Sequence, residues 1–204
     1  MNATGSAAAP DPQTPDLRSD ARRNQRRILL AAARVLADDP AASMQRIADE
    51  AEVARPTVYR RYPTREVLIE AIGREAIEEF AAALDAAQDQ DEDSAATLTR
   101  LIRALARIGA DYPIVLAGGT HAHDTAAVVE RVDSLIVRGQ AAGELRADVT
   151  SEVLRHALFG ALTAGLRLAR ADGPAADNGA SRPDPEAIGA QIAAILVEGM
   201  RAEK

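Results

Sequence analysis

Residues 43–68 read SMQRIADEAEVARPTVYRRYPTREVL, and this stretch decides the fold. Two short apolar stripes at helical spacing flank the turn segment EAEVA, residues 50–54. The first stripe contains Ile47, Ala48 and Ala51, and the second contains Val53, Val58 and Tyr62. Two short helices joined by a tight turn are typical of a helix-turn-helix, in which the second helix enters the major groove of DNA.

The segments around this stretch carry helix start and stop signals. An apolar face with members at Ile28, Leu29 and Leu36 predicts a preceding helix that ends before Pro40. Ser43 is a predicted N-cap for the next helix. Pro56 falls in the first turn of the third helix, where a missing N–H costs nothing. Thr64 is predicted to cap a long fourth helix that continues to about Leu84.

Residues 53–68 collect four arginines and two of the three tyrosines of the chain. If Val58 and Tyr62 face the core, the arginines, Thr57 and Tyr59 remain largely on the other surfaces. Guanidinium groups bind guanine edges and phosphates, and hydroxyl groups bind phosphate oxygens. A solvated basic face of an ordinary helical bundle is the alternative explanation of this cluster.

This stretch resembles the DNA-binding signature of the tetracycline-repressor (TetR) family over about residues 25–72. The match runs through Ser43, Ile47, Ala48, Ala51, Val53, Thr57, Tyr59 and Leu68, with Tyr62 and Arg65 as conservative replacements. The resemblance implies groove or base contacts for Gln45, Arg55 and Thr57, and phosphate contacts for Ser43, Tyr59, Arg61 and Arg65. Two positions depart from the family: Glu52 stands where glycine is usual, and Ala54 stands where a capping serine is usual.

Composition sets limits on the rest of the chain. The 204 residues contain no cysteine and only 2% aromatics, so disulfides and thiolate metal sites are excluded and a helical protein is favoured. The net charge is -7, but residues 18–65 contain 11 Arg and 6 Asp or Glu. The chain thus has a basic head and an acidic body. Without an apolar run long enough to span a membrane, and without a signal peptide, a cytoplasmic protein is expected.

We therefore predict an all-α fold of about nine helices. Residues 1–17 are predicted to form a disordered leader, residues 18–66 a three-helix DNA-binding domain, and residues 67–204 a helical bundle that dimerises and senses a ligand. The arginines at the start of the second segment form either a flexible arm on DNA or an exposed helix start; they are Arg18, Arg22, Arg23 and Arg26.

The predicted function is a transcriptional regulator, a repressor that a small-molecule inducer releases from a palindromic operator. The alternative is a helical small-molecule-binding or scaffolding protein without specific DNA binding. No phosphate loop, nucleophile elbow or acid/base pair is visible, so neither an enzyme nor a cofactor is expected. A metal at the H-x-H-D group of residues 121–124 is disfavoured, because it offers few ligands and no thiolate.

Two further sites are predicted in the bundle. The penultimate long helix is apolar over more than half its circumference, which favours a homodimer formed with the last helix. The predicted interface residues are Leu158, Leu162, Leu166, Ile192, Ile195 and Leu196. A mostly apolar ligand pocket is expected where the apolar stripes converge. Its predicted lining residues are Tyr112, His121, His123 and Phe159.

Overall fold

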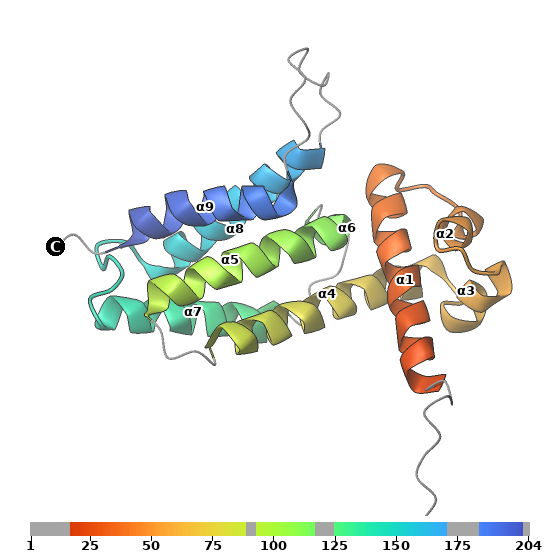
Figure 1. Cartoon of the computed structure of the whole chain (residues 1–204), viewed down its shortest axis with the longest axis horizontal. Coiled ribbons are helices and arrows are strands. Elements are labelled where there is room, and N and C mark those ends of the chain that lie inside the picture. Colours follow the sequence, from red (N-terminus) through yellow and green to blue (C-terminus); the bar gives the residue numbers. More distant parts are fainter. Residues whose placement is uncertain (1–16, 89–92, 117–124, 171–183, 202–204) are drawn as a thin grey trace, which may run out of the picture.

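The computed structural model describes residues 17–88, 93–116, 125–170 and 184–201. These ranges hold nine helices and no strand, which confirms the predicted all-α fold. In chain order the helices are α1 (Leu17–Asp38), α2 (Met44–Glu50), α3 (Arg55–Arg61), α4 (Arg65–Gln88), α5 (Ser94–Asp111), α6 (Pro113–Leu116), α7 (Thr125–Ala141), α8 (Ser151–Arg170) and α9 (Pro185–Met200) (Figure 1). The predicted leader lies outside the described residues, except for Leu17, where α1 begins.

Helices α1, α2 and α3 form a small N-terminal head. Figure 1 shows α2 and α3 on the side of α1 that faces away from the other helices. The apolar stripes seen in the sequence meet in the core of this head, and each side chain there is at most 4% exposed. They are Ile28, Leu29, Leu36, Ile47, Val58, Tyr62 and Leu68. Burial of these stripes holds three helices together that are individually too short or too polar to be stable alone.

Helix α4 connects the head to the helical body. Its N-terminal part contacts α1, and the helix also contacts α5, α6 and α7. It ends at Gln88, one turn beyond the predicted end near Leu84. The predicted division between residues 66 and 67 falls in the first turn of α4, so one continuous helix belongs to both parts.

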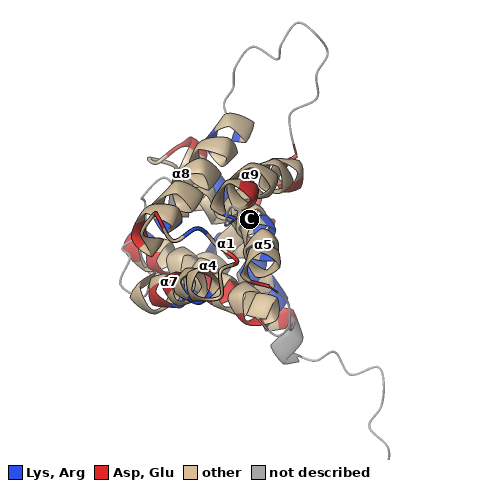
Figure 2. Cartoon of the chain, turned by 90° about the vertical axis from the view of Figure 1, so that its left-hand side faces the viewer, with Lys and Arg blue, Asp and Glu red and all other residues tan. Residues whose placement is uncertain are grey.

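The body is built around α5, which contacts α4, α7, α8 and α9 (Figure 2). Two glycines permit close approach of α9 to its neighbours. A Cβ atom on Gly189 would lie 2.5 Å from the Cβ of Ala106, and one on Gly165 would lie 2.7 Å from the Cδ1 of Ile192. These contacts leave no room for a side chain, so α9 packs tightly on both α5 and α8.

The burial of α8 corrects part of the predicted dimer interface. Leu158, Leu162 and Leu166 are 0%, 2% and 2% exposed within a single chain. They lie on the face of α8 that packs into the body, so they cannot be central to a contact between two copies. Periodicity predicted that these leucines would be buried, but it could not distinguish burial inside the protomer from burial against a partner.

The outward face of α8 carries both apolar and polar side chains. Its exposed apolar positions are the small residues Ala157, Gly160 and Ala164 together with Val153 and Leu168, which lie near its two ends at 55% and 72% exposure; its exposed polar positions are Glu152, His156 and Arg167. On α9, Ile195 is 72% exposed, whereas Ile192 and Leu196 are half-buried. Of the predicted interface residues, Ile195 is therefore the most accessible. No helix in the described ranges is long and apolar enough to cross a membrane.

Candidate nucleic-acid interface and ligand pocket

Helix α3 presents one polar face to solvent because its other face is anchored in the head. Val58 is 0% exposed and Tyr62, which follows the last turn, is 4% exposed. Among the remaining positions of α3, Arg55, Tyr59, Arg60 and Arg61 are exposed. The arginines of α3 and Tyr59 therefore lie on its accessible side, whereas Tyr62 lies in the core.

The turn between α2 and α3 contains both departures from the family pattern. Glu52 has φ 51°, a left-handed conformation that favours glycine and costs about 1–2 kcal/mol for other residues. Its carbonyl accepts a hydrogen bond from Arg27 of α1 at 3.3 Å. Ala54 occupies the N-cap position of α3 without a side-chain hydrogen bond. The turn thus keeps the left-handed geometry despite Glu52, supported by an arginine from outside it.

Two of the predicted DNA-contacting residues form a pair on α3. The guanidinium of Arg55 lies 5.0 Å from the centre of the Tyr59 ring. Its Nη2 also donates to the Tyr59 hydroxyl at 3.3 Å. A cation stacked on an aromatic ring keeps its edge free for further hydrogen bonds. This pair is held in an orientation in which Arg55 still has donors available for DNA.

Gln45 and Arg61 lie at the surface with intramolecular partners. Gln45 donates to the carboxylate of Asp49 at 2.6 Å, one turn further along α2. Arg61 donates to the amide oxygen of Gln25 on α1. Both side chains are exposed, so both can exchange these surface partners for DNA groups.

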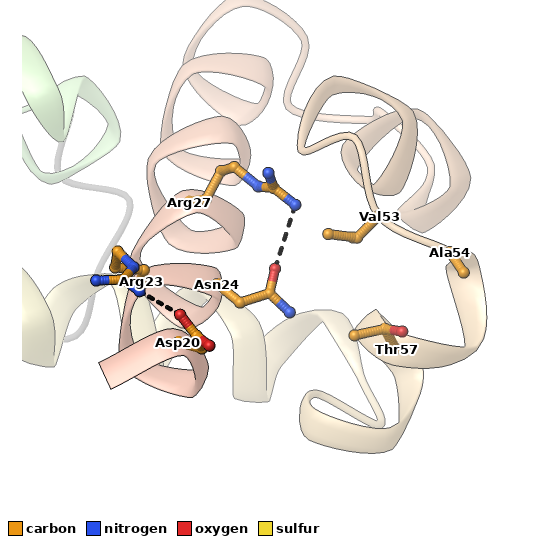
Figure 3. A pocket seen from close by; sticks show the side chains of 7 residues that line it. All are labelled: Asp20, Arg23, Asn24, Arg27, Val53, Ala54 and Thr57. Carbon is orange, nitrogen blue, oxygen red and sulfur yellow. Dashed lines mark hydrogen bonds and ion pairs between the residues drawn. The ribbon is translucent and has the colours of Figure 1, made fainter. Parts of the chain in front are cut away.

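Thr57 lines an open cleft of about 650 Å³ between α1 and α3 (Figure 3). The α1 side of this cleft carries Asp20, Arg23, Asn24 and Arg27. Asn24 accepts a hydrogen bond from Arg27 at 3.4 Å. The N-terminal arginines thus belong to a helix rather than to a flexible arm, and Arg23 and Arg27 border the same surface as α3. The sequence is compatible with both possibilities because helix propensity alone does not fix where a helix starts.

Arg65 has a different environment from the one expected for a phosphate contact. Its Nη1 donates to the carbonyl oxygen of Ala42 at 2.7 Å, and its Nη2 donates to that of Pro40. These carbonyls belong to the loop between α1 and α2. Ser43 is also engaged, since its hydroxyl accepts the Arg46 N–H at 3.2 Å as the predicted N-cap of α2. Arg65 therefore fixes the loop that positions α2.

A mostly apolar cavity of about 200 Å³ lies between α4, α5, α6, α7 and α8. Tyr112 and Phe159, both predicted to line a pocket, lie in its wall. The ring of Phe159 packs edge-on against Phe80, with 6.2 Å between centroids. The predicted His121 and His123 lie outside the described residues. Among the residues the structure does describe, no cluster of three His, Cys, Asp or Glu side chains could hold a metal.

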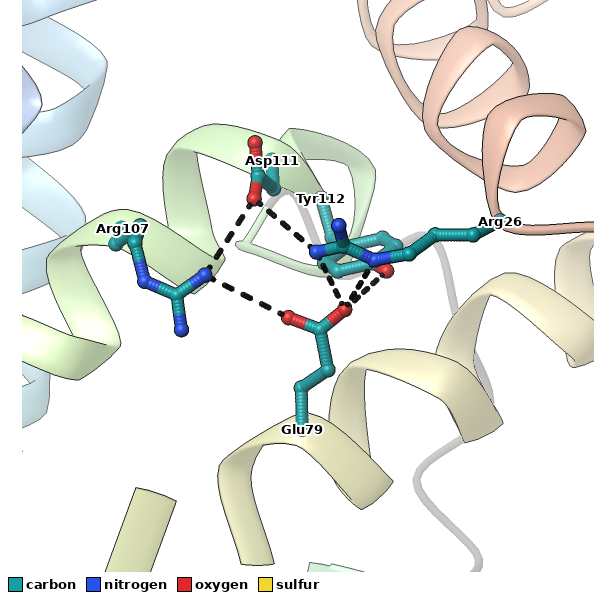
Figure 4. Close-up of polar contacts among 5 residues, drawn as sticks. All are labelled: Arg26, Glu79, Arg107, Asp111 and Tyr112. Atoms are coloured by element: carbon teal, nitrogen blue, oxygen red, sulfur yellow. Dashed lines mark hydrogen bonds and ion pairs between the residues drawn. The ribbon is translucent and has the colours of Figure 1, made fainter. Parts of the chain in front are cut away.

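A polar cluster, drawn in Figure 4, adjoins this cavity through Tyr112, which belongs to both. Its centre is Glu79 of α4, whose Oε1 accepts the Tyr112 hydroxyl at 2.8 Å and two N–H groups of Arg26 at 3.0 and 2.9 Å. Asp111 and Arg107 complete the cluster, with ion-pair distances of 3.8 to 4.0 Å. Burial, together with the hydrogen bond to Glu79, raises the pKa of Tyr112, so its phenol stays protonated and acts as a donor.

Sequence reasoning missed Glu79. It is one of several acidic residues in the segment 75–79, and nothing in the local pattern distinguishes it from Glu75 or Glu78. Its exposed side-chain fraction of 19% results from contacts with α1 and with the end of α5. A glutamate directly beside an apolar stripe residue, here Phe80, is too common a pattern to have identified it.

Known proteins resemble this chain over different lengths. The HTH-type transcriptional repressor LfrR of Mycolicibacterium smegmatis is 38% identical over 104 residues, which are 50% of this chain and 53% of the repressor. The sequence match thus spans about half the length of this relative. The crystal structure of LfrR from Mycobacterium smegmatis in complex with proflavine superposes over 89% of this chain and 99% of its own, with a TM-score of 0.58 and 28% identity. The TetR regulator SCO0520 from Streptomyces coelicolor covers 88% and 99%, with a TM-score of 0.59 and 26% identity.

A three-helix head with an anchored, outward-facing third helix is the arrangement of a helix-turn-helix DNA-binding domain. Residues 28–72, which form most of this head, match the family model described as bacterial regulatory proteins, tetR family. The chain is thus similar to TetR-family regulators in the sequence of its head, as the sequence resemblance indicated, and in its whole fold.

Proposed function

We propose that this protein is a transcriptional repressor that binds a palindromic operator as a homodimer and leaves it when a small molecule occupies the apolar cavity. The observation that carries the DNA-binding part is α3, whose buried Val58 and Tyr62 leave Arg55 and Tyr59 facing outward. The name of the relative LfrR, a transcriptional repressor, supports the direction of regulation. The role is regulatory rather than enzymatic, and we assign it to the cytoplasm.

Each half of the chain has a separate role in this proposal. Residues 18–66 bind DNA, with Arg55, Thr57 and Gln45 directed at base edges and Tyr59 and Arg61 at phosphates. Residues 67–204 bind the ligand and form the dimer. Arg23 and Arg27 at the α1 cleft supply additional positive charge beside the recognition helix.

The cavity favours a small, mostly apolar ligand. Among the described lining residues only Tyr112 and Thr125 carry a polar side-chain group, and the Phe80 and Phe159 rings suit an aromatic molecule. The complex of LfrR with proflavine, a planar aromatic compound, supports this class. Tyr112 and Phe159 are the proposed contacts, and His121 and His123 remain candidates from the adjacent segment of the sequence.

The dimer is proposed to form through the outward faces of α8 and α9. These faces carry Val153, Leu168 and Ile195, which are more than half exposed in the single chain. A two-fold axis would bring the same stripe of both copies together, with the small exposed side chains of α8 allowing close contact. Such a dimer presents two α3 helices to successive major grooves about 10 bp apart or a multiple of that.

Gel shifts with DNA from upstream of the gene test this function directly. We expect binding to a palindromic segment in the presence of excess competitor DNA, and release on addition of proflavine. Fluorescence titration of proflavine against free and operator-bound protein provides a second measurement, because linkage requires the two affinities to differ by the same factor as the DNA affinities. Ligand binding without sequence preference for DNA would instead favour a small-molecule-binding protein whose basic head is incidental.

A further inference from the structure

The polar cluster of Figure 4 joins three parts of the protein at a single carboxylate oxygen. Arg26 reaches Glu79 Oε1 from α1 in the head, Glu79 belongs to α4, and Tyr112 reaches it from the end of α5. Tyr112 is at the same time part of the cavity wall. Tyr112 therefore lines the ligand cavity and is also linked to the head, because its hydroxyl and Arg26 share Glu79 Oε1 as their acceptor.

We propose that Tyr112, Glu79 and Arg26 form a relay through which occupancy of the apolar cavity changes the attachment of α1 to the body. This inference rests on the proposed function, because it names the route by which a ligand would reach the DNA-binding head. Tyr112 and Glu79 are positioning residues in this relay, since neither is proposed to contact DNA.

The burial of the cluster makes the relay sensitive to small displacements. Tyr112 is 0% exposed; it lines the cavity, and its hydroxyl donates to Glu79 of α4. A molecule that takes up space in the cavity has to move this ring or the neighbouring phenylalanines, because protein interiors are close-packed. Movement of the phenol removes one of three hydrogen bonds that hold Glu79 in place.

Glu79 in turn determines how firmly α1 is held. Arg26 contributes two N–H groups to Glu79 and lies 3.8 Å from Asp111, so both of its ion-pair partners belong to the body. When Glu79 is free to rotate, Arg26 loses its closest contact, and α1 retains its packing contacts with α4, α5 and α6 and the ion pair between its last residue, Asp38, and Arg170 of α8. Tyr112 also directly precedes α6, which packs on α1, so its displacement affects a second contact of the same helix.

Hydrogen exchange of the full-length protein tests the relay without DNA or ligand. Tyr112→Phe keeps the ring and the cavity wall but removes the hydroxyl. We expect exchange of α1 amides in residues 26–36 to accelerate about three- to tenfold, while α9 is unchanged. The matched control is Asp133→Asn, which breaks the 2.8 Å ion pair with Arg155 between α7 and α8 and should leave α1 unchanged. Unchanged α1 exchange in Tyr112→Phe would overturn the relay.

A second set of variants fills the cavity from within. Val129→Phe places a larger side chain in the cavity, and Val137→Phe makes the same change at a half-exposed site on the same helix. The relay predicts that amide exchange in α1 is faster in Val129→Phe than in the wild type, and that it is unchanged in Val137→Phe. It also predicts that the double variant Tyr112→Phe/Val129→Phe exchanges no faster than Tyr112→Phe. Val129→Leu, which adds less volume, replaces Val129→Phe if circular dichroism shows that the latter does not fold.

The two sets of outcomes separate the relay from the proposed function. Two results would show that cavity filling does not act through the phenol. One is that Val129→Phe and Tyr112→Phe accelerate α1 exchange additively; the other is that Val129→Phe accelerates it no more than Val137→Phe does. Those results would overturn the relay even if gel shifts reveal an inducible repressor. Conversely, a failure to bind DNA would overturn the proposed function while the exchange data still decide whether the cavity and α1 are linked.

Discussion

The guanidinium of Arg55 lies 5.0 Å from the ring centre of Tyr59 and donates to the hydroxyl of the same residue at 3.3 Å. The two side chains therefore act as one unit on the exposed face of α3. The ring limits the rotamers of Arg55, which reduces the conformational entropy that the arginine loses when it binds a base edge.

Arg55→Ala is expected to weaken binding to the operator by about 1–3 kcal/mol and to leave non-specific DNA binding nearly unchanged, because the loss is that of a base contact. Fluorescence anisotropy with operator and scrambled duplexes measures both affinities. Arg103→Ala removes an exposed arginine from α5 in the body and serves as the control, which should bind both duplexes like the wild type. Equal weakening on operator and scrambled DNA would reassign Arg55 to a phosphate.

Arg65→Ala is expected to lower the free energy of unfolding by about 1–3 kcal/mol, because the carbonyls of Pro40 and Ala42 lose charge-assisted hydrogen bonds. Urea denaturation followed by circular dichroism measures this change. Arg61→Ala, which removes an exposed arginine of the same head, is the matched comparison and should affect stability less.

The salt dependence of DNA binding separates the two arginines further. A lost phosphate contact flattens the slope of log affinity against log salt by roughly one unit. We expect this change for Arg61→Ala and a much smaller one for Arg65→Ala, whose guanidinium is already bound to the loop. The opposite order would restore Arg65 as a phosphate contact, as the family resemblance implied.

Glu52→Gly is expected to stabilise the protein by about 0.5–1 kcal/mol, because glycine adopts the observed φ of 51° without steric strain. The control is Glu50→Gly at the end of α2, where the backbone is helical and glycine should destabilise by up to about 1 kcal/mol. Thermal unfolding of both variants at one protein concentration measures the difference. A destabilised Glu52→Gly variant would mean that the glutamate side chain has a favourable contact in solution.

Ile195→Glu is expected to dissociate the dimer at micromolar concentration, because it places a charge at the centre of the proposed apolar contact. Sedimentation equilibrium gives the mass of the particle, and circular dichroism shows whether the chain still folds. Val137→Glu introduces the same charge at a 50% exposed position of α7 and should leave the dimer intact. A dimeric Ile195→Glu protein would exclude this part of α9 from the interface.

Much of the local structure could be predicted from the sequence. The first four helices, the caps at Ser43 and Thr64 and the burial of Val58 and Tyr62 follow from patterns within a few residues of each position. Helix periodicity and capping are short-range properties, so they are visible in the sequence itself. For the same reason, the helix-turn-helix and its resemblance to the TetR family could be identified from the segment 43–68.

Only the tertiary structure decided which surfaces these helices turn toward one another. Leu158, Leu162 and Leu166 have the same apolar spacing whether they pack into the body or against a second copy, and the arrangement of α5 and α9 resolves this. Likewise, the contacts of Arg65 with the α1–α2 loop, and those of Glu79 with Arg26 and Tyr112, are made between residues that are 23 to 53 positions apart in the sequence. Such contacts depend on how the helices pack, which no local sequence pattern encodes.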